Sequence, residues 1–143
     1  MTSEFAEQHG AQLVSKSELF EQSQFVTIHL VLSERTRHLV GAPELELLGP
    51  RGYLINTSRG PIVDEEALLD ALNSGRIAGA ALDVFDVEPL PHDHPLRRAD
   101  NVVLTPHIGY VTSECYEIFF DHIVEDIEGF LKGEPVRQIG GEG

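Results

Sequence analysis

The chain has 143 residues, 41% of them hydrophobic, which is enough for one domain with a sizeable core and too many for a disordered protein. The 24 acidic residues outnumber the 10 Lys and Arg residues and give a net charge of −14, so most of the surface should repel nucleic acid and anionic lipid. No apolar run approaches the roughly 18–20 residues that cross a membrane. The single Cys115 excludes an internal disulfide and is typical of a reducing cytoplasm. We therefore expect a cytoplasmic protein whose partners are neither nucleic acid nor membrane.

Helix-like and strand-like segments alternate along the first half of the chain. Short helices are predicted over residues 2–9 and 16–22, on either side of "AQLV". The run "FVTIHLVL" (25–32) is apolar and rich in β-branched residues, which is typical of a strand. The segment "GAPELELLG" (41–49) has helical spacing and ends at a glycine followed by a proline.

The second half continues the alternation. Strands are predicted in "GYLINTS" (52–58), "RIAGAALDVF" (76–85) and "NVVLTPH" (101–107). Helices are predicted in "DEEALLDALNSG" (64–75), where Asp64 can cap the first turn, and in the amphipathic "SECYEIFFDHIVEDIEGFLKG" (113–133). The run over 76–85 is nearly continuously apolar, as a strand that is covered on both faces should be. The alternation of helices with near-continuously apolar strands favours an α/β fold with a parallel sheet.

Three polar side chains follow three of these strands. Arg59 comes after "YLINTS", Glu88 after "AALDVFDV" and His107 after "VVLTP". In parallel sheets, ligands bind where the carboxyl ends of the strands open into loops. We therefore expect these three side chains to lie near one ligand, although strand-end arginines, glutamates and histidines can equally be ordinary loop residues.

The three residue types suit the reduction of a 2-oxo acid. A guanidinium makes a planar two-point contact with a carboxylate, so Arg59 can anchor the substrate. An imidazole titrates near neutral pH, so His107 can protonate a carbonyl oxygen, and Glu88 can orient that ring. No side chain is a source of hydride, so a nicotinamide cofactor would be required. The histidines of "PHDHP" (91–95) are predicted to face solvent rather than bind a metal.

Two long stretches resemble the D-isomer-specific 2-hydroxyacid dehydrogenases. They are "LINTSRGPIVDEEALLDALNSGRIAGAALDVFDVEPL" and "NVVLTPHIG", and the similarity extends from about residue 12 to about residue 137. The resemblance implies that Arg59 is the substrate-binding arginine, Glu88 the glutamate that supports the histidine, and His107 the acid/base. Having Glu88 with His107 disfavours the formate dehydrogenase branch of the family.

The resemblance also implies NAD or NADP as cofactor. Its contacts would come from the "NTSRG" turn, from the "ALDVF" strand end, from "HIG" and, as a weaker candidate, from "IHLVL". The predicted cofactor-binding residues are Leu30, Thr57, Ser58, Arg59, Asp83, His107, Ile108 and Gly109. Two departures from the family stand near this site, Val31 in place of a proline and Tyr110 in place of a small residue.

The glycine-rich "GxGxxG" turn of the family has no counterpart in the chain. We therefore expect a partial Rossmann-like parallel sheet flanked by helices, which lacks the first strands and that turn. Residues 1–111 would form the partial NAD-binding domain, and residues 112–143 would return to the substrate domain. "AQLV" (11–14) would be the third strand of the family's sheet, and "FVTIHL" (25–30) would be its fourth and an open apolar edge. Without the substrate domain, the helix over 113–133 would expose its phenylalanines.

The expected function is that of a fragment of an oxidoreductase that transfers a hydride between NAD(P)H and a small 2-oxo or 2-hydroxy acid. Phosphoglycerate dehydrogenase and glyoxylate or hydroxypyruvate reductase are the expected types, and the intact protein is expected to be a homodimer. Whether the chain alone is an enzyme stays open, because we expect weak or no NAD binding and marginal folding or association through the open edge. The alternatives are a non-catalytic dinucleotide-sensing or interaction module of the corepressor type and an inactive truncated product.

Overall fold

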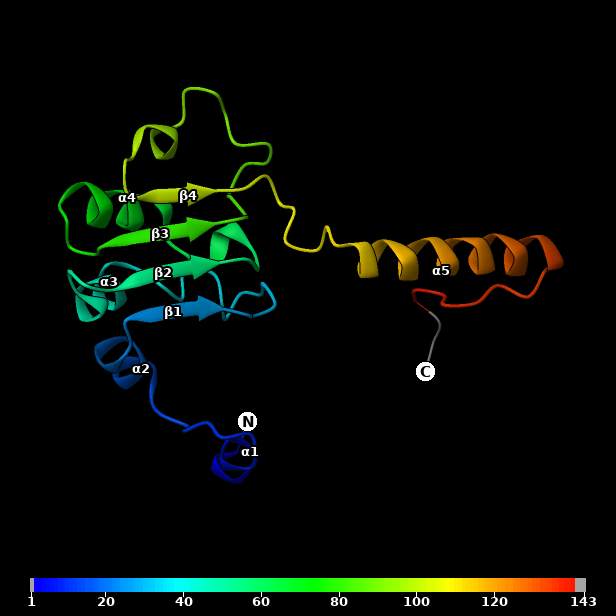
Figure 1. Ribbon diagram of the computed structural model, residues 1–143, viewed down its shortest axis with the longest axis horizontal. Helices are drawn as coiled ribbons and strands as arrows, with labels where there is room; N and C mark the ends of the chain where they lie inside the picture. Colours follow the sequence, from blue (N-terminus) through cyan, green and yellow to red (C-terminus); the bar gives the residue numbers. More distant parts are fainter. Residues whose placement is uncertain (1, 141–143) are drawn as a thin grey trace. The chain divides into compact units, whose positions relative to one another are not determined.

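The computed structural model describes residues 2–140, which belong to two compact units divided between His107 and Ile108. Figure 1 shows the order of the helices and strands along the chain. The elements are α1 (Ser3–Gln8), α2 (Lys16–Gln22), β1 (Phe25–Ile28), α3 (Ala42–Leu48), β2 (Tyr53–Asn56), the 3-10 helix η1 (Gly60–Ile62), α4 (Glu65–Asn73), β3 (Gly79–Leu82), the 3-10 helix η2 (Pro95–Arg98), β4 (Val102–Leu104) and α5 (Ser113–Lys132).

The first unit is built on a four-stranded parallel sheet in the order β1-β2-β3-β4. At the carboxyl end of the sheet the register aligns Ile28 with Asn56, Asn56 with Leu82, and Leu82 with Leu104. The strands therefore end in one row, and the loops that follow them begin at the same edge of the sheet (Figure 1). The α/β fold class predicted from the sequence is confirmed.

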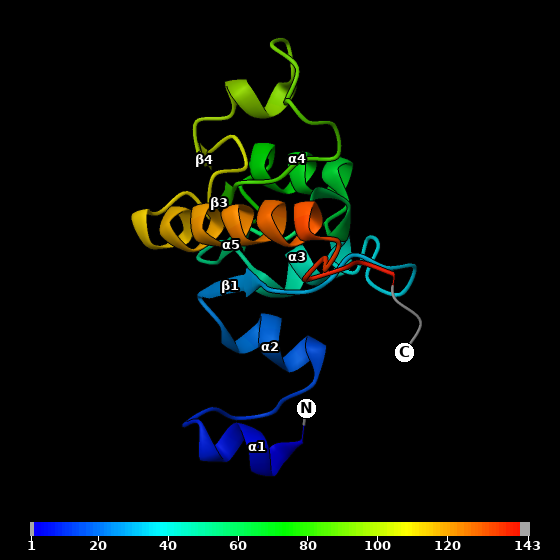
Figure 2. The ribbon, with the colours of Figure 1, turned by 90° about the vertical axis from the view of Figure 1, so that its right-hand side faces the viewer.

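The core lies on one face of this sheet, where α3 and α4 lie on the same side of the strands (Figure 2). Alternate residues of each strand point to this face, as the period of two in an extended chain requires. Asp64 caps α4 through an Ala67 N–H···Oδ1 hydrogen bond of 3.1 Å, so the helix begins where its apolar stripe can meet the sheet. The buried residues of the sheet and of these two helices include Val26, Ile28, Leu45, Leu48, Leu54, Leu68, Ala71, Leu72 and Leu82.

The opposite face of the sheet is apolar and exposed. Phe25 of β1 is 61% exposed and Val103 of β4 is 63% exposed. The rings of Phe25 and Tyr53 stack side by side, with their centroids 5.1 Å apart. Strand β1 stands at the end of the sheet, which confirms the predicted open edge. In β3, the strand for which cover on both faces was expected, three residues are buried and Ala81 is half-buried. Association through this edge stays a prediction.

The predicted strand "AQLV" does not form, and residues 11–14 are an irregular connection between α1 and α2. A strand exists only where a neighbour completes its backbone hydrogen bonds. Within the described sheet, β1 forms its backbone hydrogen bonds with β2, and no strand pairs with residues 11–14. Leu13, the central apolar residue of this segment, is 45% exposed.

The second unit consists of α5 and the segment that follows it. Thr112 caps the helix by accepting the Cys115 N–H at 3.2 Å, and Gly133 ends it in the left-handed conformation. Arg137 binds the carboxylates of Glu125 and Asp126, at 2.7 and 3.0 Å, and so ties the following segment to the polar side of the helix.

No residue of α5 is buried. The predicted exposure of its phenylalanines is confirmed: Phe119, Phe120 and Phe130 are 43%, 63% and 74% exposed. That this unit returns to a substrate domain stays a prediction. Within the part of the chain that the structure describes, every helix is too short or too polar to span a lipid bilayer.

Candidate functional site

The turn after β2 is organised by a buried asparagine. Asn56 is 1% exposed, its Nδ2 donates to the Arg59 carbonyl at 2.9 Å, and its Oδ1 accepts the Ser58 N–H at 3.0 Å. The Ser58 hydroxyl donates to the carbonyl of Ile28 at the end of β1, at 2.8 Å. Because a buried amide must find partners for both of its polar atoms, Asn56 holds the backbone of Arg59 in one conformation beside the end of β1.

Gly60 brings this turn against the loop that follows β3. A Cβ atom at Gly60 would lie 2.1 Å from the backbone carbonyl carbon of Phe85, so any side chain would push the two segments apart. The close approach therefore requires glycine at this position. It places the Arg59 turn next to the segment that leads to Glu88.

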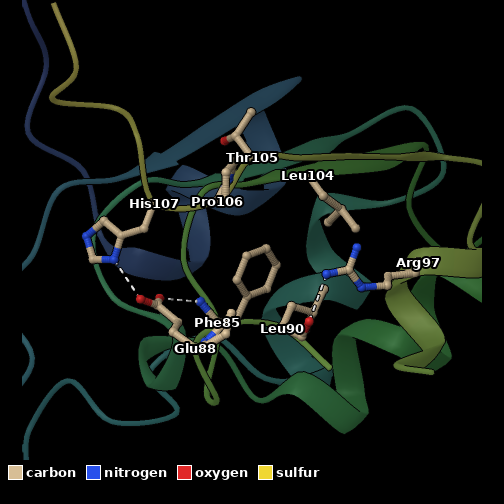
Figure 3. Close-up of a pocket in the computed structure, with 9 residues that line it drawn as sticks. Phe85, Glu88, Leu90, Arg97, Leu104, Thr105, Pro106 and His107 are labelled. Carbon is tan, nitrogen blue, oxygen red and sulfur yellow. Dashed lines mark hydrogen bonds and ion pairs between the residues drawn. The ribbon is translucent and has the colours of Figure 1, made fainter. Parts of the chain in front are cut away.

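Glu88 and His107 form a hydrogen-bonded ion pair (Figure 3). The Phe85 N–H donates to Glu88 Oε1 at 2.9 Å, which orients the carboxylate, and His107 Nδ1 lies 2.7 Å from Oε2. An ionised carboxylate only accepts hydrogen bonds, so the pair places a proton on Nδ1. His107 also has a φ of 59°, a left-handed conformation that few non-glycine residues adopt and that is found at functional sites.

The electrostatics of the pair favour a charged Glu88. Burial raises the pKa of this carboxyl, but the hydrogen bonds from His107 and the Phe85 N–H, together with the positive charges of His107 and Arg59, bring the pKa below its ordinary value. The guanidinium of Arg59 therefore acts on Glu88 through space, although it contacts the Ser58 carbonyl through Nη1 at 2.6 Å.

Asp83 lies at the end of β3 and is 5% exposed. The Thr105 hydroxyl donates to its Oδ1 at 2.5 Å, and the Asp83 N–H donates to the carbonyl of Asn56 at 3.0 Å. A carboxylate buried at the end of a parallel strand, with its orientation set by the next strand, is suited to accept hydrogen bonds from a ligand at the row of strand ends.

Two pockets open along this row. The larger has a volume of about 500 Å³ and is lined by Glu88 and His107 (Figure 3). The other has a volume of about 390 Å³ and is lined by residues 29–32 and 57–59.

The pockets divide the predicted site residues into two groups. Glu88 and His107 share the larger pocket, while Leu30, Thr57, Ser58 and Arg59 line the other. The predicted cofactor contacts Ile108 and Gly109 belong to the second unit.

Four residues that fix or line the site were not predicted from the sequence: Asn56, Gly60, Thr105 and Arg97. Asn56 and Gly60 are the first and last residues of the "NTSRG" motif. An asparagine at the end of an apolar strand and a glycine next to the arginine were the sequence features that could have indicated them.

Residues 1–109 match the family model described as "D-isomer specific 2-hydroxyacid dehydrogenase, NAD binding domain". The chain belongs to the D-isomer specific 2-hydroxyacid dehydrogenase family. The sequence resemblance is thereby confirmed. The predicted division into residues 1–111 and 112–143 stays a prediction.

Curated relatives and solved structures of this family are similar over most of the chain. A glyoxylate reductase of Thermofilum pendens is 49% identical over 116 residues, which are 81% of this chain and 34% of the relative. A D-3-phosphoglycerate dehydrogenase of Methanocaldococcus jannaschii is 41% identical over 137 residues, 95% of this chain and 26% of the relative. A D-lactate dehydrogenase of Aquifex aeolicus, solved with NAD and lactic acid, superimposes with a TM-score of 0.81 at 30% identity and covers 94% of this chain and 45% of that structure. The chain therefore spans less than half the length of each.

Proposed function

We propose that the chain carries the acid/base and nicotinamide side of a D-2-hydroxyacid dehydrogenase active site, with Arg59, Glu88 and His107 as its catalytic residues. The observation that supports this proposal best is the 2.7 Å ion pair between His107 and Glu88, which stands at the row of strand ends within the electrostatic reach of Arg59. A hydrogen-bonded histidine and carboxylate beside a cation is the arrangement that reduction of a 2-oxo acid needs.

Arg59 is the proposed anchor for the substrate carboxylate. Its Nη1 donates to a carbonyl of its own turn, and a guanidinium has five N–H donors in a planar fork, so donors remain for a two-point contact. The Asn56 turn sets the backbone from which this side chain extends. A fixed anchor matters because a reacting group held in place removes much of the entropic barrier to reaction.

His107 is the proposed acid in the direction of reduction and base in the direction of oxidation. Glu88 accepts the Nδ1–H hydrogen bond and carries a negative charge, so it stabilises the imidazolium that gives a proton from Nε2 to the substrate carbonyl oxygen. In the opposite direction the neutral imidazole takes the hydroxyl proton at the same nitrogen. Glu88 therefore acts by orienting the imidazole ring and by stabilising its positive charge.

The cofactor is proposed to be NAD or NADP, and when bound it supplies or accepts the hydride. Leu30, Thr57 and Ser58 line the pocket of about 390 Å³ at the ends of β1 and β2, and the buried carboxylate of Asp83 stands at the end of β3. These groups fit the amide and ribose hydroxyls of a nicotinamide nucleoside, because they offer acceptors and donors at the strand ends where such sheets bind dinucleotides. The contacts of Ile108 and Gly109, which belong to the second unit, stay predictions from the family resemblance.

The names of the relatives suggest the class of substrate. Glyoxylate reductase, hydroxypyruvate reductase and D-3-phosphoglycerate dehydrogenase are the names of the similar proteins, so we propose a small 2-oxo or 2-hydroxy acid for this chain as well. A homodimer of the intact protein and a cytoplasmic location belong to the same proposal, the location resting on the acidic composition and the single cysteine.

The test uses the chain both alone and fused behind the segment that precedes the matched region in the Thermofilum pendens relative. We expect the fusion to oxidise NADH or NADPH with glyoxylate, hydroxypyruvate or pyruvate, and His107→Ala to lower kcat by about 10²–10⁴-fold. Glu88→Gln should lower kcat and change its pH profile, because the imidazolium loses its anionic partner. His92→Ala, a substitution in an exposed loop, is the matched control.

Unchanged turnover in His107→Ala would reject the assignment of the acid/base. A folded fusion that binds NADH and reduces none of these acids would favour the non-catalytic sensing module instead. Weak or absent NADH binding by the chain alone is expected, because a dinucleotide-binding fold holds the pyrophosphate at a glycine-rich turn.

A further inference from the structure

The larger pocket has a second cation at the end remote from the catalytic pair. Figure 3 places His107 and Glu88 at one end and Arg97 at the other, with Phe85 and Leu90 between them. We propose that Arg97 selects 2-oxo acids that carry a second anionic group, such as a carboxylate, at the far end of a short carbon chain. This inference rests on the proposed function, because it takes His107 as the residue at the reacting carbonyl.

Arg97 is held in position without being neutralised. Its Nε donates to the Pro91 carbonyl at 2.8 Å and its Nη2 donates to the Leu90 carbonyl at 2.7 Å. Arg76 and Arg137 pair with carboxylates, but the hydrogen bonds given for Arg97 within the described residues go to neutral carbonyl oxygens. The guanidinium therefore keeps its positive charge at the pocket wall, in a chain whose net charge is −14.

The pocket between the two ends is apolar. Phe85 and Leu90 are 8% and 7% exposed, and Leu104 lines the wall beside Arg97. Such a wall favours a methylene chain and disfavours a charge along its length. Glu88 adds a negative charge at the His107 end, so a second anion on the ligand would be repelled there and attracted at Arg97.

The size of the pocket agrees with a ligand longer than the smallest oxo acids. Its volume of about 500 Å³ is in the range of pockets that hold whole small molecules. A two-carbon or three-carbon acid anchored near His107 would leave the Arg97 end to water, whereas a five-carbon acid with a terminal carboxylate would extend toward it. The pocket therefore distinguishes ligands by what stands at their far end.

The experiment compares two acids of equal carbon number, 2-oxoglutarate and 2-oxopentanoate, which differ in having a carboxylate or a methyl group at the far end. Each is titrated into the chain at fixed ionic strength, and amide shifts are followed by ¹H–¹⁵N NMR. We expect 2-oxoglutarate to bind about tenfold more tightly, since a charge-assisted hydrogen bond contributes that order of affinity. The largest shifts should include the amides of Phe85 and Leu90.

Three variants assign the preference to Arg97. Arg97→Gln should abolish the preference for 2-oxoglutarate over 2-oxopentanoate, while Arg97→Lys should keep part of it. Arg98→Gln makes the same change of charge at a neighbouring residue that does not line the pocket, and it should leave the preference intact. Arg59→Gln should weaken the binding of both acids, because it removes the proposed anchor that they share.

The outcomes separate this inference from the proposed function. Equal binding of the two acids, or a preference that survives in Arg97→Gln, overturns the role of Arg97 and leaves the roles of Arg59 and His107 standing. Failure of both acids to bind the folded wild-type chain overturns the carboxylate anchor, and the inference with it.

Discussion

Helices α4 and α5 begin in the same way and are packed differently. Asp64 caps α4 and Thr112 caps α5, each by accepting the N–H of the third helical residue, at 3.1 and 3.2 Å. Both helices carry an apolar stripe, yet α4 buries Leu68, Ala71 and Leu72 while α5, with 20 residues, buries none. The comparison teaches that capping and periodicity form a helix, whereas only a complementary surface turns its stripe into a core.

The largest expected effect is the loss of a core side chain from the first unit. Leu54→Ala removes a leucine of β2 that is 0% exposed, so the cavity should lower the free energy of unfolding by about 2–5 kcal/mol. Phe130→Ala in α5 removes a larger side chain that is 74% exposed, so the free energy of unfolding should change by less than about 0.5 kcal/mol. Urea denaturation followed by circular dichroism measures both. Equal losses would show that α5 is packed in solution and would remove the contrast between the units.

The next effect concerns the close approach that joins two loops of the site. Gly60→Ala places a methyl group against the Phe85 backbone and should cost about 1–3 kcal/mol of stability. It should also separate Arg59 from Glu88 and so raise the pKa of Glu88, which NMR titration of that carboxyl measures. The matched control is Gly41→Ala, where the added Cβ would meet no heavy atom closer than 3.8 Å. If the pKa of Glu88 is the same in both variants, the two loops are positioned by other contacts.

A smaller effect should distinguish the two helices by their caps. Thr112→Ala should destabilise α5 by about 1 kcal/mol, and because no residue of this helix is buried, its first turns should lose protection from amide hydrogen exchange. Asp64→Ala should cost a similar free energy in α4, but the helix should remain formed because the sheet holds its apolar face. Loss of protection in both helices would mean that packing does not compensate for a missing cap.

The smallest effect is a pH dependence within the first unit. Burial raises the pKa of Glu44, but hydrogen bonds from Lys16 and from the Gly41 N–H outweigh it and bring the pKa below its ordinary value. Because the folded pKa is the lower one, the carboxylate adds stability above the ordinary glutamate value of about 4.3, and this contribution is lost as the pH falls through the folded pKa.

Glu44→Gln should therefore flatten the fall of stability below neutral pH, by at most about 1 kcal/mol. Denaturant midpoints measured from pH 7 to pH 3 test this, with Glu21→Gln as a control for the change of charge on an exposed helix residue. A parallel fall of stability in wild type and Glu44→Gln would rule out this carboxylate as the cause.

Part of the candidate site could be predicted from the sequence. Arg59, Glu88 and His107 each follow a strand, and the structure brings Glu88 and His107 together at one pocket. The roles that the family resemblance implies for these three residues stay a prediction. Asn56, which holds the turn of Arg59, was not predicted, because a polar residue at the end of an apolar strand does not reveal which backbone groups it will bind. Arg97 was missed for a similar reason, since it lies in the loop before β4 and reaches the pocket of His107 only through the fold.

The sequence by itself determined the local elements, the parallel α/β class and the family. These depend on periodicity, caps and motifs, which are properties of neighbouring residues. Only the tertiary structure decided that residues 11–14 do not form a strand, that one face of the sheet stays exposed, and that Glu88 contacts His107 at 2.7 Å. Each of these features depends on which segments that are distant in the sequence supply hydrogen bonds and buried surface. Local sequence patterns do not identify such long-range partners.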